Sequence, residues 1–323
     1  MSLQFNQRSL GKSSIKITPI GLGAWQFSEG KNFNNLIWKS IDSETTNEII
    51  SQAVKAGINW IDTAEYYGKG ASERGVSRGL QAANLGDNDV KIATKWWPLL
   101  RFAKNIPKSI SKRIKALSPY SIDLYQIHQP FSFSSVEKQM QNMVKIANLN
   151  LIKSIGVSNF TLENMIKAYE ELEKNDYPLV SNQVSYSILD RRIETNGLLE
   201  KANELGITII AYSPLQLGLL SGKYHSDPSL INNLPMGRRR FMKERISKTT
   251  ELMNLLDQIS DETNMSVSQI SLNWIISKNE KMVTIPGATK PHHAKESAET
   301  MNFKLRKEQI DTINELSQNI KFL

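Results

Sequence analysis

The chain has 323 residues, of which 40% are hydrophobic and none is cysteine, and its net charge is +8. The missing cysteines exclude disulfides and thiolate nucleophiles, and no apolar run approaches the ~20 residues of a membrane-spanning helix. Lysines alternate with acids as on solvated helix faces, so the charge favours a phosphate-bearing ligand over nucleic acid. Because the start of the chain lacks the apolar core of a signal peptide, we expect a soluble, cytoplasmic protein.

The first expected element is a β-hairpin within residues 1–18, which would close the bottom of a barrel. From Pro19 onward, short β-rich runs alternate with helical patterns, which is typical of parallel βα units. Strands are expected near residues 20–24, 60–63, 91–95, 124–128, 154–157, 181–184, 208–212 and 283–286. Eight such strands predict an α/β fold, a single (β/α)8 TIM barrel spanning residues 1–323.

Two helix starts are expected at capping boxes, one formed by Thr45 with Glu48 and one by Ser134 with Glu137. Residues 216–245, between the seventh strand and its helix, are polar and longer than a connecting turn requires. We therefore expect a long functional loop there.

Polar side chains stand at the ends of three neighbouring strands. Asp62 ends the second strand, Tyr66 and Tyr67 follow it, and Lys95 and His128 end the next two strands. Because the carboxyl ends of parallel strands meet at one face of a barrel, we expect these side chains to share one pocket. Each residue alone has a simpler interpretation: a helix cap for the aspartate, a core position for the histidine and packing for either tyrosine. Their joint placement favours a site.

The set suits reduction of a carbonyl group. A carbonyl that accepts hydride needs a proton donor, and a tyrosine with its usual pKa of ~10 becomes suitable if a nearby ammonium lowers that pKa. Lys95 could be that ammonium, with Asp62 keeping it charged, and His128 could donate a hydrogen bond to the substrate oxygen. The hydride would come from a nicotinamide cofactor.

At these positions the chain resembles the aldo-keto reductases, whose Asp, Tyr, Lys and His tetrad matches Asp62, Tyr67, Lys95 and His128 in order. The family tyrosine directly precedes a glycine, which favours Tyr67 over Tyr66. The resemblance continues through nearly the whole chain, in residues 156–160, 182–186, 211–215, 221–224 and 285–289. It implies a reductase that transfers hydride from NADPH to an aldehyde or ketone, with Tyr67 as general acid and no metal.

The resemblance also implies a set of cofactor-binding residues. Those expected at the nicotinamide end are Gly23, Ala24, Trp25, Asp62, Ser158, Asn159, Gln183 and Tyr212. Those expected at the pyrophosphate are Ser213, Pro214, Leu215, Gly218 and Lys223, on the cofactor side of the 216–245 loop. Those expected at the adenosine are Arg238, Gly287, Thr289, Lys290, His293, Glu296 and Ser297. The substrate is expected to contact Trp25, Tyr67, Trp96 and His128.

Two adenosine positions depart from the family pattern, because His293 replaces the frequent Arg or Gln and Ser297 replaces the usual Asn. The run of three arginines from Arg238 leaves open which of them meets the adenosine phosphate. The side chains suited to a 2′-phosphate are the hydroxyl of Thr289 and the cations of Lys290 and Arg238, so we expect NADP as the cofactor.

The expected partner is a small carbonyl compound, with neither nucleic acid nor membrane, and a homo-oligomer is left open. Residues 182–224 resemble pyridoxal reductases among other relatives, so pyridoxal is one candidate substrate. The alternative is a cofactor-binding regulatory protein with little turnover, because the resemblance also reaches the β subunits of potassium channels. The chain lacks the long amino-terminal extension that such subunits use for gating.

Overall fold

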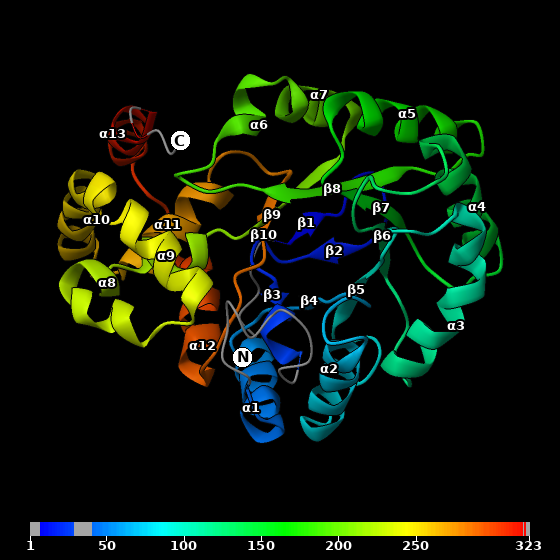
Figure 1. Ribbon diagram of the computed structural model, residues 1–323, viewed down its shortest axis with the longest axis horizontal. Helices are drawn as coiled ribbons and strands as arrows, with labels where there is room; N and C mark the ends of the chain where they lie inside the picture. The colour runs from blue at the N-terminus through cyan, green and yellow to red at the C-terminus, as the bar shows by residue number, and fades with distance from the viewer. Residues whose placement is uncertain (1–6, 29–40, 319, 321–323) are drawn as a thin grey trace.

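The computed structural model describes residues 7–28, 41–318 and 320. Its main sheet has eight parallel strands, which follow one another in chain order (Figure 1). They are β3 (Leu22–Gly23), β4 (Trp60–Asp62), β5 (Lys91–Trp96), β6 (Leu124–Ile127), β7 (Ile155–Ser158), β8 (Leu179–Ser185), β9 (Thr208–Tyr212) and β10 (Met282–Thr284). Parallel bridges from Ile20 to Thr284 and from Gly23 to Gly287 join the two edges. The predicted (β/α)8 barrel is confirmed.

Helices surround the sheet (Figure 1). They are α1 (Ser43–Lys55), α2 (Ala71–Ala82), α3 (Ile106–Leu117), α4 (Val136–Asn148), α5 (Leu162–Glu173), α6 (Arg192–Thr195), α7 (Leu198–Leu205), α10 (Thr250–Thr263), α11 (Val267–Ile276), α12 (Pro291–Glu299) and α13 (Lys307–Gln318). Among the described residues, no helix is long and apolar enough to cross a membrane.

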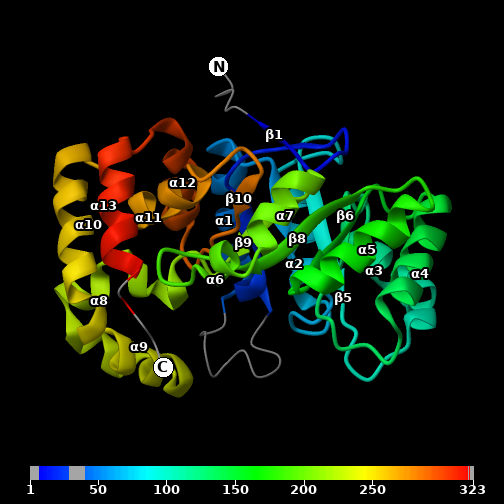
Figure 2. The same cartoon turned by 90° about the horizontal axis from the view of Figure 1, so that it is seen from above.

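The predicted hairpin is present as β1 (Arg8–Ser9) paired with antiparallel β2 (Lys16–Ile17), although residues 1–6 of the predicted segment lie outside the described part. Leu10 and Ile17 pack against Trp60, Leu124 and other residues inside the barrel. Figure 2 shows β1 on the opposite side of the barrel from α8 and α9. The hairpin therefore closes the amino-terminal end and leaves the other end open.

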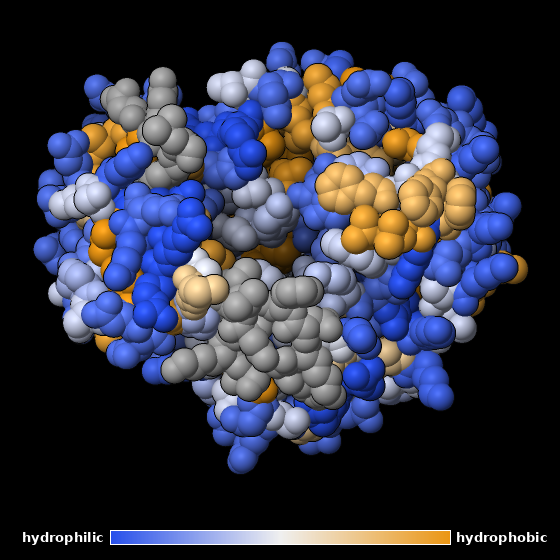
Figure 3. Space-filling view, viewed as in Figure 1, coloured by the Kyte–Doolittle hydropathy of each residue, from blue (hydrophilic) through white to orange (hydrophobic). Residues whose placement is uncertain are grey.

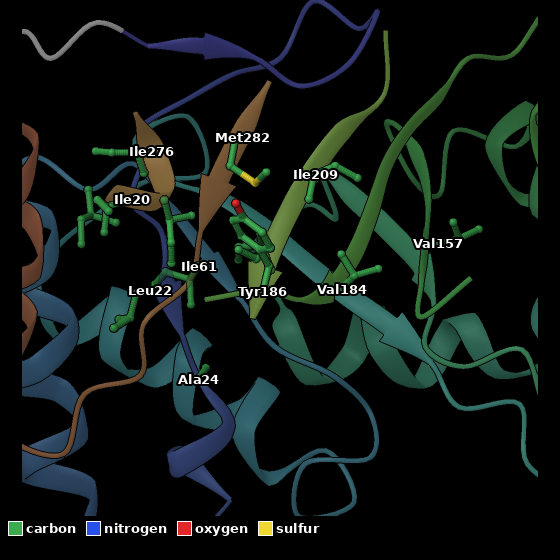
Figure 4. Close-up of a cluster of buried hydrophobic side chains, with 14 of the residues drawn as sticks. Ile20, Leu22, Ala24, Ile61, Val157, Val184, Tyr186, Ile209, Ile276 and Met282 are labelled. Atoms are coloured by element: carbon green, nitrogen blue, oxygen red, sulfur yellow. The ribbon is translucent and has the colours of Figure 1, made fainter. Parts of the chain in front are cut away.

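The core lies mainly between strands and helices. Ile61, Ile209 and Met282 are fully buried in this layer, and Figure 4 shows them with other apolar side chains that project from the strands. Because side chains alternate along a strand, the residues next to these point into the barrel. Trp60 and Ile210 do so, in the cluster below the hairpin.

Both predicted capping boxes are wrong, because each helix is capped by a residue close to the predicted one in the sequence. Asp42 caps α1, and its carboxylate accepts from the Thr45 N–H at 2.7 Å. The hydroxyl of Ser134 accepts instead from the Ala103 N–H at 2.9 Å, so Ser135 caps α4.

The predicted loop at 216–245 is also wrong, because the segment folds into short helices. They are η4 (Gln216–Ser221), α8 (Lys223–Ser226), η5 (Pro228–Asn233) and α9 (Met236–Arg245). These turns bury a small core of their own, formed by Leu219, Tyr224, Ile231 and Met242. A wall of the open end is therefore built from packed helices.

Candidate active site

Alternation along the strands directs Asp62 of β4 and Lys95 of β5 into the barrel. Trp60 lies inside the barrel and Ile61 outside, so Asp62 points inward at the end of β4. By the same period, Lys95 points inward from β5, and His128 follows β6. The structure therefore brings the predicted residues together at the carboxyl ends of three adjacent strands.

Lys95 and Asp62 form a buried ion pair behind the cavity. The Lys95 ammonium donates to the Asp62 carboxylate and, at 2.9 Å, to the Thr63 carbonyl. The second Asp62 oxygen accepts from Gln183 at 2.9 Å and from Gln126 at 3.2 Å. Burial lowers the pKa of Lys95, and the charge of Asp62 opposes that shift. Sequence reasoning missed Gln126, whose amide inside an otherwise apolar strand was the available signal.

Tyr67 lies next to this pair. The Lys95 Nζ is 5.2 Å from the centre of the Tyr67 ring, and the His128 ring is 5.6 Å away, edge to face. Burial raises the pKa of Tyr67, and the charge of Asp62 raises it further. The expected lowering by Lys95 is not seen, because Asp62 offsets the ammonium and burial disfavours a phenolate. Tyr67 is thus held in its protonated form.

Tyr66 has a different environment. Its ring stacks on Trp97, with centroids 4.1 Å apart and an interplanar angle of 19°, and it is 36% exposed. The Lys95 ammonium lies over the ring of Tyr67, 5.2 Å from its centre. The geometry therefore favours Tyr67 as the tyrosine coupled to the ion pair.

Trp96, expected to contact substrate, does not line the cavity. Because Lys95 points inward, the next residue on β5 points to the helices, where Trp96 is fully buried and donates to Asn105 at 3.1 Å. Trp97 lines the cavity instead, and its ring lies 5.1 Å from that of His128.

Glu65, which sequence reasoning also missed, holds this tryptophan. Its carboxylate accepts from the Trp97 N–H at 2.6 Å, from Arg101 at 2.5 Å and from Arg113 at 3.1 Å. Glu65 thereby ties the loop after β4 to the loop after β5, the two loops that carry Tyr67 and Trp97.

A cavity of about 710 Å³ opens at this face, and Figure 3 shows the hollow at its mouth. It is bordered by Tyr67 and His128, and it extends to residues of α8, α9 and α12. Of the predicted cofactor residues, those that line it are Gly23, Ala24, Trp25, Asp62, Ser158, Asn159, Gln183, Tyr212, Ser213, Pro214, Leu215, Gly218, Lys223, Arg238, Gly287, Thr289, His293, Glu296 and Ser297. Lys290 does not line the cavity and is exposed to solvent.

The predicted nicotinamide residues are linked to one another. Asn159 accepts from the Tyr212 hydroxyl at 2.8 Å and donates to the Ser158 hydroxyl at 3.1 Å and the His128 carbonyl at 3.2 Å. Asn159 itself has a φ of 59°, a left-handed conformation that asparagine tolerates better than most residues. These bonds fix the wall beside the tetrad.

The predicted pyrophosphate stretch is an irregular turn with several positive φ angles, including 91° at Gly218. Arg238 crosses this turn and donates to the Leu217 carbonyl and the Tyr224 hydroxyl, both at 2.8 Å. A Cβ on Gly218 would come within 2.9 Å of the Arg238 guanidinium. Arg240, in contrast, is exposed and pairs with Glu244. Arg238 is thus the arginine of the run on the cavity wall.

The cavity wall suits a dinucleotide. The Oε1 atom of Gln26 is buried without a hydrogen-bond partner among the described residues, as is the Nδ1 atom of His128. A Cβ on Gly287 would meet the Gln26 amide at 2.1 Å, so only glycine leaves the wall as it is. Open backbone, unsatisfied polar atoms and cations at one end fit a polar ligand with phosphate groups.

Proteins of similar sequence and structure include several reductases. The chloroplastic pyridoxal reductase of Arabidopsis thaliana is 28% identical over 307 residues, which are 90% of this chain and 80% of that protein. The NADH-specific methylglyoxal reductase of Escherichia coli (strain K12) is 26% identical over 338 residues, which cover 97% and 98%. The structure of the thermostable aldo-keto reductase Tm1743 with the inhibitor epalrestat matches with a TM-score of 0.77 at 29% identity, covering 96% of this chain and 99% of that one. The model of the Aldo/keto reductase family matches residues 19–318, and the chain therefore belongs to this family.

Proposed function

We propose that this protein reduces an aldehyde or ketone with NADPH. The observation that carries the proposal is the position of Tyr67 beside the buried Lys95–Asp62 pair, at one end of a cavity whose other end is basic. The bound nicotinamide would supply the hydride, and its pocket would be the wall formed by Ser158, Asn159 and Tyr212.

The side chains of the tetrad would complete the reaction. As negative charge develops on the carbonyl oxygen, Tyr67 would donate its phenolic proton. Burial and the charge of Lys95 lower the pKa of His128 well below its usual value, so its ring is neutral at pH 7 and would donate a hydrogen bond without carrying charge. Asp62 and Lys95 would act behind the tyrosine, where their opposite charges balance each other.

Support for NADP over NAD comes from the basic end of the cavity. Lys223 and Arg238 line it. Burial lowers the pKa of Lys223, and the charges of Arg238 and Lys290 lower it further, so both cations lie close enough to repel Lys223. A phosphate with two negative charges would relieve that repulsion. Glu296, the acid at this end, accepts a hydrogen bond from Ser266, the residue that caps α11. A relative named for NADH specificity shows that family membership alone does not decide the cofactor.

We expect kcat/KM with NADPH to exceed that with NADH by about a hundredfold, because two charge-assisted contacts contribute ~1.5 to 3 kcal/mol each. The double change Arg238→Ala with Lys290→Ala should remove most of this difference. Arg240→Ala is the matched control, since Arg240 pairs with Glu244 at the surface, and it should keep the preference. Thermal unfolding of each variant checks that the lost Arg238 hydrogen bonds have not unfolded the protein. Equal use of both cofactors by the unmodified protein would contradict the assignment.

A panel of carbonyl compounds that includes pyridoxal, scored by NADPH consumption, tests the activity and ranks its substrates. The aromatic rings of Trp25, Tyr66 and Trp97 line the cavity near the tetrad, so apolar and ring-bearing carbonyls should be reduced faster than small polar ones. No consumption with any aldehyde or ketone would contradict the proposed function.

A further inference from the structure

The end of the cavity formed by α8, α9 and α12 concentrates positive charge. Lys223 of α8 and Arg238 of α9 line it, and Lys290 caps the amino terminus of α12. Two histidines, His292 and His293, follow in the first turn of α12 and also line the cavity. Hydrophilic side chains gather on this side of the hollow in Figure 3.

His293 is held in place within this group. Its Nδ1 atom lies 3.3 Å from the Thr289 hydroxyl, and its ring packs edge to face against that of His292 with centroids 4.5 Å apart. The side chain is half-buried. With Nδ1 facing Thr289, a ligand in the cavity would meet this ring through Nε2.

The surroundings of His293 disfavour its charged form. Burial, followed by the positive charges of His292, Lys223 and Lys290, lowers the pKa of His293 to about 4. Its ring is therefore neutral at pH 7. The acid one turn further along α12, Glu296, accepts from Ser266 and is not among the groups that shift this pKa.

We propose that His293 takes up one proton from solvent when the 2′-phosphate of NADP binds beside it, so that the preference for NADPH over NADH increases as the pH falls. The inference rests on the proposed cofactor. A phosphate with about two negative charges reverses the sign of the local field, and the imidazolium form gains a charge-assisted hydrogen bond. NADH lacks this phosphate, so the His293 ring stays neutral when NADH binds.

The direction of the pH effect follows from linkage. Between the pKa of His293 in the free protein, about 4, and its higher pKa in the complex, each unit of decrease in pH strengthens NADPH binding by up to about tenfold. The phosphate has its own second pKa near ~6, and its protonation acts in the opposite direction. A variant with a permanent charge at position 293 therefore separates the two effects.

The test is to measure dissociation constants for NADPH and NADH between about pH 6.5 and 8 in the unmodified protein and three variants. In the unmodified protein the ratio of the NADH dissociation constant to the NADPH dissociation constant should rise by about five- to tenfold toward pH 6.5. In His293→Arg it should be high and no longer rise, and in His293→Gln it should be low and flat. His225→Gln is the matched control, because His225 faces Thr249 and does not line the cavity, and it should behave like the unmodified protein.

Calorimetry in two buffers of different ionisation enthalpy counts the protons taken up and needs no variant. Near pH 7, where a phosphate with a second pKa near ~6 is already largely ionised, a net uptake of up to one proton should accompany NADPH, and none should accompany NADH. An NADPH preference without proton uptake, or with the same pH dependence in His293→Arg, would overturn this inference alone. Equal affinity for both cofactors at every pH would contradict the proposed cofactor, and this inference with it.

Discussion

Replacing Tyr67 with phenylalanine should lower kcat by about 10²- to 10⁴-fold and leave the affinity for NADPH nearly unchanged. The change removes the hydroxyl of the ring that lies beside the Lys95 ammonium, at the end of the cavity bordered by His128, and keeps the ring that packs there. Steady-state rates and cofactor titration by fluorescence measure the two quantities separately.

Tyr66→Phe is the matched control, because it removes the same atom from the neighbouring residue. The Tyr66 ring stacks on Trp97, and that contact survives the change. Substantial activity should therefore remain. Comparable losses in the two variants would show that the proton does not come from Tyr67 in particular.

Lys95→Met should lose about as much turnover as Tyr67→Phe and should also unfold more easily. Without the ammonium, the side chains of the described residues that still donate to the buried Asp62 carboxylate are the amides of Gln126 and Gln183. The unopposed charge of Asp62 should raise the pKa of Tyr67 further. Breaking a buried ion pair by removing one partner costs about 3–5 kcal/mol in the free energy of unfolding.

The double variant Lys95→Met with Asp62→Asn separates the two consequences. Removing the second charge should restore much of the stability, because no uncompensated carboxylate is left, while activity should stay low. Denaturant unfolding and kcat are the measurements. A Lys95→Met enzyme with full activity would rule out the proposed role of the ion pair.

The positions of the tetrad could be predicted from the sequence because they depend on two regular features. Strand alternation has a period of two, and parallel strands end at a common face. Asp62, Lys95 and His128 could therefore be placed together from their positions in three apolar runs. The choice between Tyr66 and Tyr67 depended on the resemblance to the family, because a loop has no period.

The failures come from contacts between distant segments or from short elements. Trp96 was expected at the substrate because the end of β5 was placed one residue early, and one residue reverses the direction of a side chain. Ser134 does not cap α4 because its hydroxyl bonds Ala103, 31 positions away. The helices within 216–245 span four to ten residues, too few for a clear helical period.

The residues that line or support the cavity also divide into those that could be predicted from the sequence and those that could not. Positions that need glycine, such as Gly218 and Gly287, could be predicted from motifs. The role of Glu65 could not, because it depends on Trp97 and two arginines that folding brings near it. Nothing in the local sequence distinguishes Glu65 from a surface acid.

The most direct test of the proposed function is to follow a labelled hydride. The protein is incubated with an aldehyde and NADPH that carries deuterium at the transferable position of the nicotinamide, and the alcohol is analysed by mass spectrometry. We predict one deuterium on the carbinol carbon for each NADPH oxidised, and loss of this product in Tyr67→Phe. Tight binding of NADPH with no labelled alcohol from any carbonyl compound would contradict the proposal and indicate a cofactor-binding protein without turnover.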